Sequence, residues 1–102
     1  MKKDSILYKK FETSIKKSKQ KDIKKNRIFD EFDYIDIEFL YIQYKLQKNH
    51  CYYCDKFMAR SGPMNDDKMT IERLDDTLPH IKTNCVLACF YCNNLRSKYS
   101  HY

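Results

Sequence analysis

The sequence predicts a small α+β protein, with helices in its N-terminal half and two short strands and a closing helix in its C-terminal half. Three patterns predict this class: apolar residues spaced four apart near the start, two short strand-like runs after residue 68, and two cysteine pairs that bracket these runs. With 102 residues, the chain has room for one domain. We expect residues 1–35 to form a basic helical arm and an acidic connector, and residues 36–102 to form a helix and the cysteine-bearing module.

The first helix is predicted from Leu7, Phe11 and Ile15, which recur at four-residue steps and share one helical face. This pattern predicts a helix over roughly residues 4–19, with basic side chains on its other faces. Over residues 20–27 the pattern lapses, so that a linker and a continued helix both fit.

Positive charge is concentrated at the N-terminus. Residues 1–27 hold eleven Lys or Arg and three Asp or Glu, whereas residues 28–102 hold nine and eleven. A one-signed basic stretch releases counterions when it meets a phosphate backbone, which indicates salt-sensitive affinity for nucleic acid without sequence choice. The structural alternative is a solvated helix face or a tail kept soluble by its charge. The side chains expected at the nucleic acid are Lys16, Lys17, Lys19, Lys21, Lys24, Lys25 and Arg27.

An acidic and aromatic connector, residues 29–36, leads into a second predicted helix. Asp36 suits its N-cap, because a carboxylate accepts hydrogen bonds from the first backbone N–H groups of a helix. The apolar pattern continues to about Lys48, and Asn49 can end the helix. We expect the apolar side of this helix to lie on the cysteine-bearing module, which is too short to hold a large core unaided.

Four cysteines form two C-x2-C pairs, a spacing that lets each pair grip one tetrahedral metal ion from a single turn. Zinc is the expected ion, with an iron site or buried thiols as alternatives. We expect this metal to be structural and to supply much of the folding free energy of so short a module. The ligand set is Cys51, Cys54, Cys89 and Cys92.

Two neighbours of this set have other expected roles. Cys85 lies in an apolar run, which favours a buried, inert thiol over a reactive one or an alternate ligand. His50 adjoins Cys51 and is a rival ligand, although four thiolates already fill a tetrahedral site.

Cysteine usage and hydropathy indicate a reducing compartment. An odd number of cysteines, the C-x2-C spacing and the lack of an apolar run of signal-peptide length argue against a secreted disulfide framework. No segment approaches the roughly 20 apolar residues that a membrane-spanning helix needs. We therefore expect an intracellular protein, in the cytoplasm or nucleus of a host cell or in a virion, with no membrane partner.

Short elements follow the second predicted helix. Residues 51–54 are expected to form a metal-binding turn, and residues 60–67 a polar loop that holds the only glycine. Beyond this loop we expect strands at residues 69–74 and 85–88, separated by a break at residues 75–79, and a closing helix over residues 93 to about 100.

This order of strand, loop, strand and helix, with Asn93 directly after the last cysteine, resembles the zinc-bearing, four-cysteine branch of the HNH endonucleases, which are ββα-metal (His-Me finger) nucleases. The segments that carry the resemblance are residues 69–75, 79–89 and 90–96, within a match of roughly residues 48–98. The chain is also similar to homing-type HNH proteins of phages and giant viruses. The resemblance implies a zinc-stapled ββα-metal core that hydrolyses DNA phosphodiester bonds with one divalent ion, magnesium or manganese.

The resemblance also implies roles for individual residues. Glu72 and Asn93 match the ion ligands of the family, Asn84 its central asparagine and Arg73 its general base. Arginine keeps its proton at any ordinary pH and cannot activate water, so that Arg73 is expected to grip phosphate instead. Water activation then falls to one of three groups: His80, Asp75 or a metal-bound hydroxide.

The residues on the first strand also have structural interpretations. Glu72 suits a strand carboxylate paired with a lysine, and Arg73 suits an ion pair with Glu72 or Asp75. Asn93 suits a helix cap, a role that is compatible with ion ligation.

The remaining site residues have such alternatives too. His80 suits an ordinary loop residue, and Asn84 is expected to fix its loop through backbone hydrogen bonds. Arg96 and Lys98 lie on the helix expected to face DNA, either as phosphate contacts or as solvated charges.

The function that this sequence predicts is an HNH-type endonuclease acting on double-stranded DNA. One cutting site would nick one strand, so that double-strand cleavage requires a homodimer. A non-catalytic zinc protein that packages nucleic acid is the first alternative, and Arg73 at the base position supports it. The second is a zinc-stapled subunit of a larger assembly, whose nine Tyr and six Phe bind a protein partner.

Overall fold

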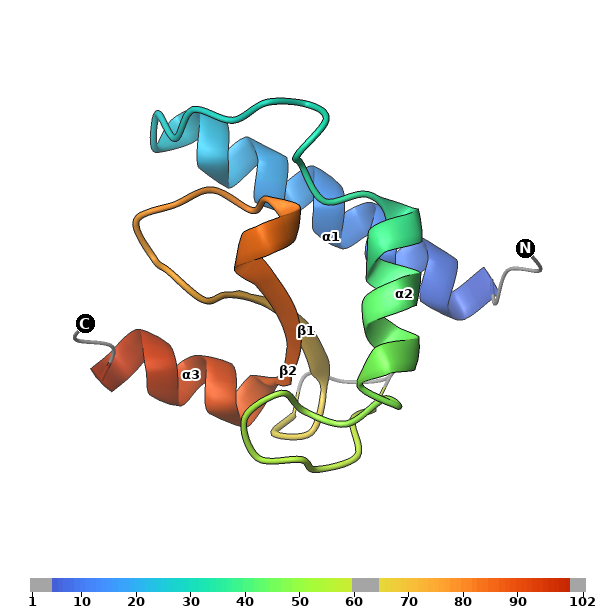
Figure 1. Ribbon diagram of the computed structural model, residues 1–102. Helices are drawn as coiled ribbons and strands as arrows, with labels where there is room; N and C mark the ends of the chain where they lie inside the picture. Colours follow the sequence, from blue (N-terminus) through green and yellow to red (C-terminus); the bar gives the residue numbers. More distant parts are fainter. Residues whose placement is uncertain (1–4, 60–64, 100–102) are drawn as a thin grey trace.

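The computed structural model describes residues 5–59 and 65–99, which form a small α+β fold of three α-helices and a two-stranded sheet (Figure 1). The predicted fold class is thus confirmed at this level. In chain order the elements are α1 (Ser5–Lys24), α2 (Ile37–Leu46), β1 (Met69–Arg73), the 3-10 helix η1 (Lys82–Asn84), β2 (Cys85–Cys89) and α3 (Phe90–Tyr99).

Helix α1 continues through the segment that sequence patterns left open. Ser18 and Asp22 extend the face of Leu7 and Phe11 at helical spacing, and all four side chains are buried. The helix ends in a Schellman motif, in which the Arg27 N–H donates to the Asp22 carbonyl and Asn26 takes a positive φ of 59°. The buried face of α1 therefore continues with the polar residues Ser18 and Asp22, and the helix reaches Lys24 although its apolar pattern stops earlier.

Helix α2 begins where the sequence predicts. The Asp36 carboxylate accepts a hydrogen bond of 2.8 Å from the backbone N–H of Phe39, which confirms the N-cap. The helix ends at Leu46, two residues before the expected end, because Lys48 and Asn49 adopt φ values of 53° and 60° that no α-helix tolerates.

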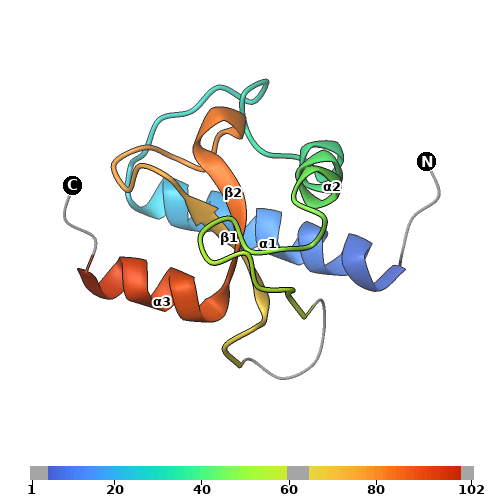
Figure 2. The ribbon, with the colours of Figure 1, turned by 60° about the horizontal axis from the view of Figure 1, so that its bottom comes forward.

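Strands β1 and β2 form an antiparallel pair with Met69 opposite Cys89 and Arg73 opposite Cys85. Both strands agree with prediction to within one residue. Helix α3 leaves directly from the end of β2 (Figure 2) and starts at Phe90, three residues before the expected start. Its first N–H groups, at Phe90 and Tyr91, donate to the carbonyls of Lys68 and Asp66, so that the start needs no side-chain cap.

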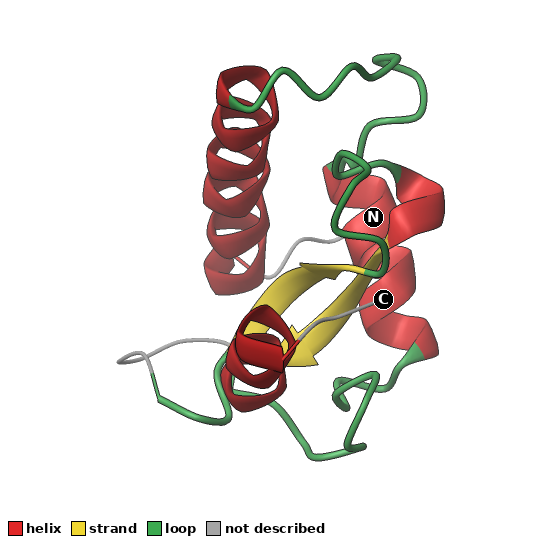
Figure 3. Cartoon of the chain, turned by 90° about the vertical axis from the view of Figure 1, so that its left-hand side faces the viewer, coloured by secondary structure: helices red, strands yellow, loops and turns green. Residues whose placement is uncertain are grey.

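One apolar core joins the N-terminal helices to the cysteine-bearing module. In Figure 3 the two strands lie between the helices, with α3 packed on both strands, α2 on β2, and α1 on α2. The ring of Phe11 packs edge-on against the ring of Tyr41 at 5.5 Å between centroids. The helix expected as part of an arm therefore shares a core with the module. Its buried members are Leu7, Phe11, Leu40, Tyr41, Cys51, Met58, Met69, Leu87, Ala88, Cys89 and Cys92.

None of the described helices combines the length and the apolar character needed to cross a membrane.

Candidate functional site

The four predicted cysteine ligands come together from three elements. Cys51 and Cys54 lie in a turn after α2, Cys89 ends β2, and Cys92 lies in the first turn of α3. Their sulfur atoms all lie within 4.8 Å of one another. The sulfurs of Cys54 and Cys89 are 3.8 Å apart, and a tetrahedral zinc with bonds of about 2.3 Å would place its ligands about 3.8 Å apart. The cluster is therefore positioned to hold a metal ion.

Backbone N–H groups point at these sulfurs. Cys51 Sγ accepts from the N–H of Cys89 at 3.3 Å and of Tyr53 at 3.4 Å, and Cys89 Sγ accepts from that of Cys92 at 3.5 Å. Burial alone would raise the pKa of Cys51, but the backbone N–H groups of Cys54, Cys89 and Tyr53 lower it to about 7. Burial raises the pKa of Cys89 and Cys92. The amide donors favour thiolates, which are the form that binds a metal.

The turn that carries the first pair is attached to the sheet. The N–H of Tyr52 donates to the Leu87 carbonyl on β2, and the N–H of Cys51 to the Lys56 carbonyl. Asp55 takes a positive φ of 63°, which closes the turn tightly enough for its N–H to reach the Cys51 carbonyl. The local sequence thus forms the turn, and β2 fixes where it sits.

The two other candidates near the cluster do not join it. Among the described residues, the group within ligand distance contains the four cysteines and not His50, whose ring packs edge-on against Phe57 at 5.5 Å. Cys85 is buried in β2, and burial raises its pKa to about 12. The burial expected of this thiol is confirmed, and the raised pKa favours its protonated form.

Glu72 and Asn93, the predicted ion ligands, lie at the interface of β1 and α3. The Asn93 amide Nδ2 donates to the Thr70 hydroxyl at 2.9 Å, and the Arg96 Nε donates to Glu72 Oε2 at 2.9 Å. Thr70 and Glu72 are two apart on the strand, so they share a face, and Asn93 and Arg96 are three apart on the helix. The structure therefore brings both predicted ligands to one interface.

Neither Glu72 nor Asn93 has the structural role that the sequence also allowed, a lysine pair for Glu72 and a helix cap for Asn93. Glu72 is 8% exposed, and its partner is Arg96 rather than a lysine. Burial raises the pKa of Glu72, while the hydrogen bond from Arg96 acts in the opposite direction. Asn93 is not a helix cap, because α3 begins at Phe90.

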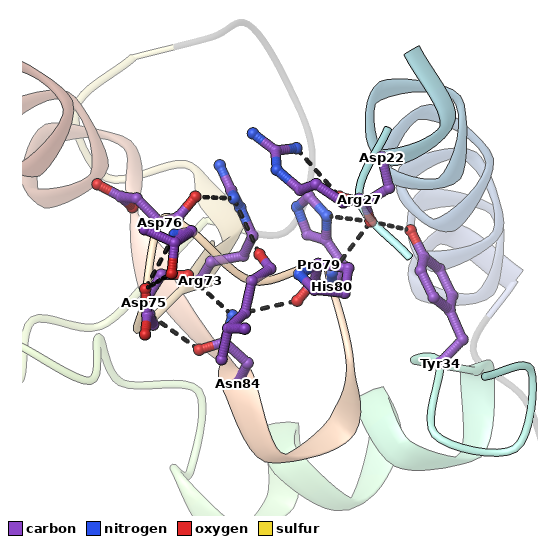
Figure 4. A network of polar contacts seen from close by, with 11 residues as sticks. Asp22, Arg27, Tyr34, Arg73, Asp75, Asp76, Pro79, His80 and Asn84 are labelled. Atoms are coloured by element: carbon purple, nitrogen blue, oxygen red, sulfur yellow. Dashed lines mark hydrogen bonds and ion pairs between the residues drawn. The ribbon is translucent and has the colours of Figure 1, made fainter. Parts of the chain in front are cut away.

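Arg73 and Asp75 both act within the loop that joins the strands. The Arg73 Nη1 donates to the carbonyls of Asp76, at 2.6 Å, and of Leu78, at 3.0 Å. The Asp75 side chain accepts from the hydroxyl and the N–H of Thr77, which hold the pKa of this exposed carboxyl below its usual value. These contacts give the loop, residues 74–84, a defined shape (Figure 4).

Asn84 closes the same loop. Its Oδ1 accepts from the Asp75 N–H at 2.8 Å, and its Nδ2 donates to the carbonyls of Asp75 at 3.0 Å and Pro79 at 3.1 Å. The side chain is buried and satisfies three backbone groups at once. The loop-fixing hydrogen bonds expected of Asn84 are present.

His80 is buried and turned toward α1. Its Nδ1 lies 2.9 Å from Asp22 Oδ2, and its backbone N–H donates to the same oxygen at 3.0 Å (Figure 4). Burial lowers the pKa of His80, against the pull of the Asp22 charge. The His80 ring therefore contacts a buried carboxylate and is not the solvent-exposed loop side chain that the structural alternative implied.

Asp22 is a buried hub that sequence reasoning did not single out. Its side chain is inaccessible and accepts four hydrogen bonds: two from His80, one from the Tyr34 hydroxyl at 2.7 Å and one from Arg27 Nη1 at 3.0 Å. Burial would raise the pKa of Asp22, but the donors from Tyr34 and His80 lower it to about 2. The available signal was an aspartate on the apolar face of α1 within a run of lysines.

Some of the side chains predicted to contact nucleic acid already form ion pairs within the protein. Lys19 pairs with Glu31 at 2.8 Å, Arg27 pairs with Asp22, and Arg96 pairs with Glu72. Lys98 lies in α3, and its side chain falls outside the described part of the structure. Exposed lysines of α1 and its C-terminal end make up the rest of the set: Lys16, Lys17, Lys21, Lys24 and Lys25.

Comparison with known proteins finds a viral relative for about half of the chain. Over 53 residues, which are 52% of its length, this chain is 36% identical to an uncharacterized protein of Acanthamoeba polyphaga mimivirus. The matched part spans 9% of the length of that protein. No protein-family model and no solved structure matches the chain.

The Asp22 hub generates a stability prediction. Asp22→Ala should lower the free energy of unfolding by about 3–5 kcal/mol, because it leaves the Arg27 charge and three other donors without their acceptor. Tyr34→Phe removes one donor and leaves the other three bonds, so that its cost should be about 0.5–1.5 kcal/mol. Urea unfolding followed by circular dichroism measures both. The prediction is wrong if Asp22→Ala costs no more than Tyr34→Phe.

Proposed function

We propose that this chain is a zinc-stabilised nuclease module of the HNH, ββα-metal type, which hydrolyses a DNA phosphodiester bond with magnesium or manganese. The observation that carries the proposal is that Glu72 and Asn93 both lie at the β1–α3 interface, with Asn93 one residue beyond the last cysteine of the cluster. A strand carboxylate and a helix amide on one interface offer the oxygen ligands that a hard divalent ion prefers.

The cysteine cluster supports zinc as the structural ion. Four cysteine sulfurs lie within 4.8 Å of one another and would fill all four positions around one ion. A closed site with no open position for a substrate is typical of structural zinc. Backbone N–H groups directed at two of the sulfurs supply the outer hydrogen bonds that such sites need. The metal would then hold the turn, β2 and α3 together.

The proposed ion ligands follow from side-chain chemistry, and the proposed water-orienting group follows from exposure. When bound, the divalent ion supplies electrostatic stabilisation of the scissile phosphate and of the departing 3′ oxygen. Glu72 and Asn93 would hold it through side-chain oxygens, since the Asn93 Nδ2 already donates to Thr70. Asp75 is exposed, whereas His80 is buried with Nδ1 on Asp22, and this difference favours Asp75 as the group that orients water.

DNA affinity is proposed to come from the exposed lysines of α1 and the residue after it. A basic surface attracts the phosphate backbone without reading bases, so that the number and sign of these charges matter more than their exact positions. Lys19 and Arg27, which pair with Glu31 and Asp22, are expected to contribute less.

A second candidate, a non-catalytic zinc protein that binds nucleic acid, is favoured by two observations. The Glu72 carboxylate is already bound by Arg96, and the Arg73 guanidinium at the expected base position is bound by loop carbonyls. Such a protein would bind DNA with the same lysines and would not cut it.

Metal removal tests the zinc proposal. Stripping zinc with a chelator should unfold the module, because structural zinc contributes on the order of 10 kcal/mol to domains of this kind. Cys89→Ala should abolish stoichiometric zinc binding, while Cys85→Ala, a change of the fifth cysteine, should retain it. Atomic absorption and far-UV circular dichroism report the two properties. An unchanged spectrum after complete zinc removal would refute the structural role.

A plasmid-nicking assay tests the nuclease proposal. Zinc-loaded protein is expected to nick supercoiled DNA with magnesium or manganese and not with EDTA. Glu72→Gln and Asn93→Ala should each lower the rate at least about a hundredfold by removing an ion ligand, whereas Asn94→Ala, at the neighbouring exposed position of α3, should not. Salt-dependent binding without cutting under any metal would instead support the second candidate.

The salt dependence of DNA binding tests the role of α1. Replacing Lys17, Lys21 and Lys24 with Gln should reduce the slope of log K against log salt by about 0.9 for each phosphate that the variant no longer neutralises. The matched control replaces three exposed lysines outside α1: Lys45, Lys48 and Lys56. Fluorescence anisotropy of a labelled duplex measures both slopes, and equal reductions in the two triple variants would show that α1 is not the binding surface.

A further inference from the structure

The Glu72 carboxylate at the β1–α3 interface is held by an arginine that belongs to the same fold. Arg96 Nε donates to Glu72 Oε2 at 2.9 Å. The Nη2 of the same guanidinium donates to the Leu74 carbonyl at 3.1 Å and to the Arg73 carbonyl at 3.4 Å. Three acceptors on β1 and the residue after it thus bind one guanidinium, which places it directly on the proposed ion ligand.

The cysteine-bearing turn supplies the other side of this arginine. The guanidinium carbon of Arg96 lies 4.6 Å from the centre of the Tyr53 ring, within the range of a cation–π contact. Tyr53 stands between Cys51 and Cys54, and its N–H donates to Cys51 Sγ. The arginine is therefore positioned between an aromatic ring on the turn and a carboxylate on the strand.

Charge balance explains why the arginine lies there. Glu72 is 8% exposed, and a carboxylate this buried is costly unless a cation or strong donors accompany it. A divalent cation bound to the same carboxylate would stand beside the guanidinium, and two cations at such short range repel each other strongly where water is scarce. The guanidinium and a divalent ion would therefore compete for the charge of Glu72.

We propose that Arg96 is a displaceable internal counter-ion, which must leave Glu72 before a divalent cation binds that carboxylate. The inference rests on the proposed function for the identity of Glu72 as an ion ligand. A phosphodiester offers the released guanidinium a two-pronged partner, since arginine and phosphate match in geometry. Binding of a nucleic-acid backbone therefore frees Glu72 for the metal, so that the ion site opens in the presence of substrate.

Manganese binding to the zinc-loaded protein tests the proposal, with free Mn²⁺ measured by electron paramagnetic resonance. Arg96→Met keeps a linear side chain against Tyr53 and removes the charge. Because a hydrogen bond to a charged group is worth about a ten- to hundredfold change in a binding constant, Arg96→Met should bind Mn²⁺ tighter by about that factor. The double variant Arg96→Met with Glu72→Gln should not show this increase. Mn²⁺ affinity of Arg96→Met equal to or weaker than that of the wild type overturns the proposal.

Two variants of Tyr53 give an independent test that leaves the arginine in place. Tyr53→Leu removes the ring beside the guanidinium and should also tighten Mn²⁺ binding, whereas Tyr53→Phe keeps the ring and should match the wild type. Zinc content and circular dichroism establish that each variant is folded. If Arg96→Met does not fold, the Tyr53 pair decides, and identical Mn²⁺ affinities of Tyr53→Leu and Tyr53→Phe overturn the proposal.

The effect of DNA on Mn²⁺ binding tests the link to substrate. After subtraction of the Mn²⁺ that the duplex binds by itself, a short duplex should tighten Mn²⁺ binding to the wild type by a larger factor than to Arg96→Met. An equal effect on both would refute that link. Mn²⁺ binding does not depend on cleavage, so that the two proposals fail separately. Tighter Mn²⁺ binding in Arg96→Met together with no nicking by the wild-type protein refutes the nuclease alone. Nicking that depends on Glu72, together with an unaltered Mn²⁺ affinity in Arg96→Met, refutes the counter-ion proposal alone.

Discussion

The convergence of four cysteine sulfurs joins the turn after α2, the end of β2 and the start of α3 at one point. Cys89 is the last residue of β2, and Cys92 follows within the first turn of α3, so that the cluster fixes the angle at which the helix leaves the strand. That angle lays α3 along β1 and brings the side chains of Asn93 and Arg96 to Thr70 and Glu72. The module has little apolar area, and burial of that area alone offsets little of the chain entropy that folding removes. A junction of this kind therefore matters for its stability.

A second anchor holds the opposite end of the strand pair. The cysteine cluster lies where Met69 pairs with Cys89, whereas the loop beyond Arg73 and Cys85 is bound through His80 to the buried carboxylate of Asp22. Asp22 belongs to α1, so this contact also fixes the basic helix relative to the strands. A buried ionised group is costly unless it is fully paired, and four donors satisfy this one. The lysines of α1 therefore lie on a helix whose position relative to the strands is fixed.

Between the two anchors lies Glu72, a buried carboxylate on a strand held at both ends. Such rigidity suits an ion ligand, since metal sites need side chains whose positions are set before the ion arrives. The same interface holds Arg96 on the carboxylate at 2.9 Å. The proposed nuclease and the proposed counter-ion describe two states of one interface, and the competition between two cations for one buried carboxylate links them. The non-catalytic alternative corresponds to a protein in which the arginine never leaves.

Local patterns in the sequence determined the fold class, the cysteine cluster, the Asp36 cap, both strands and the loop-closing role of Asn84. These features depend on residues close in the chain or on spacings that one element imposes, so that a short window contains the whole signal. Tertiary structure alone decided the full length of α1, the early start of α3, the engagement of Glu72 by Arg96 and the burial of His80 against Asp22. The partners in that last contact are 58 residues apart in the chain. A charged side chain in a run of lysines looks solvated until folding supplies distant donors, and no local window contains those donors.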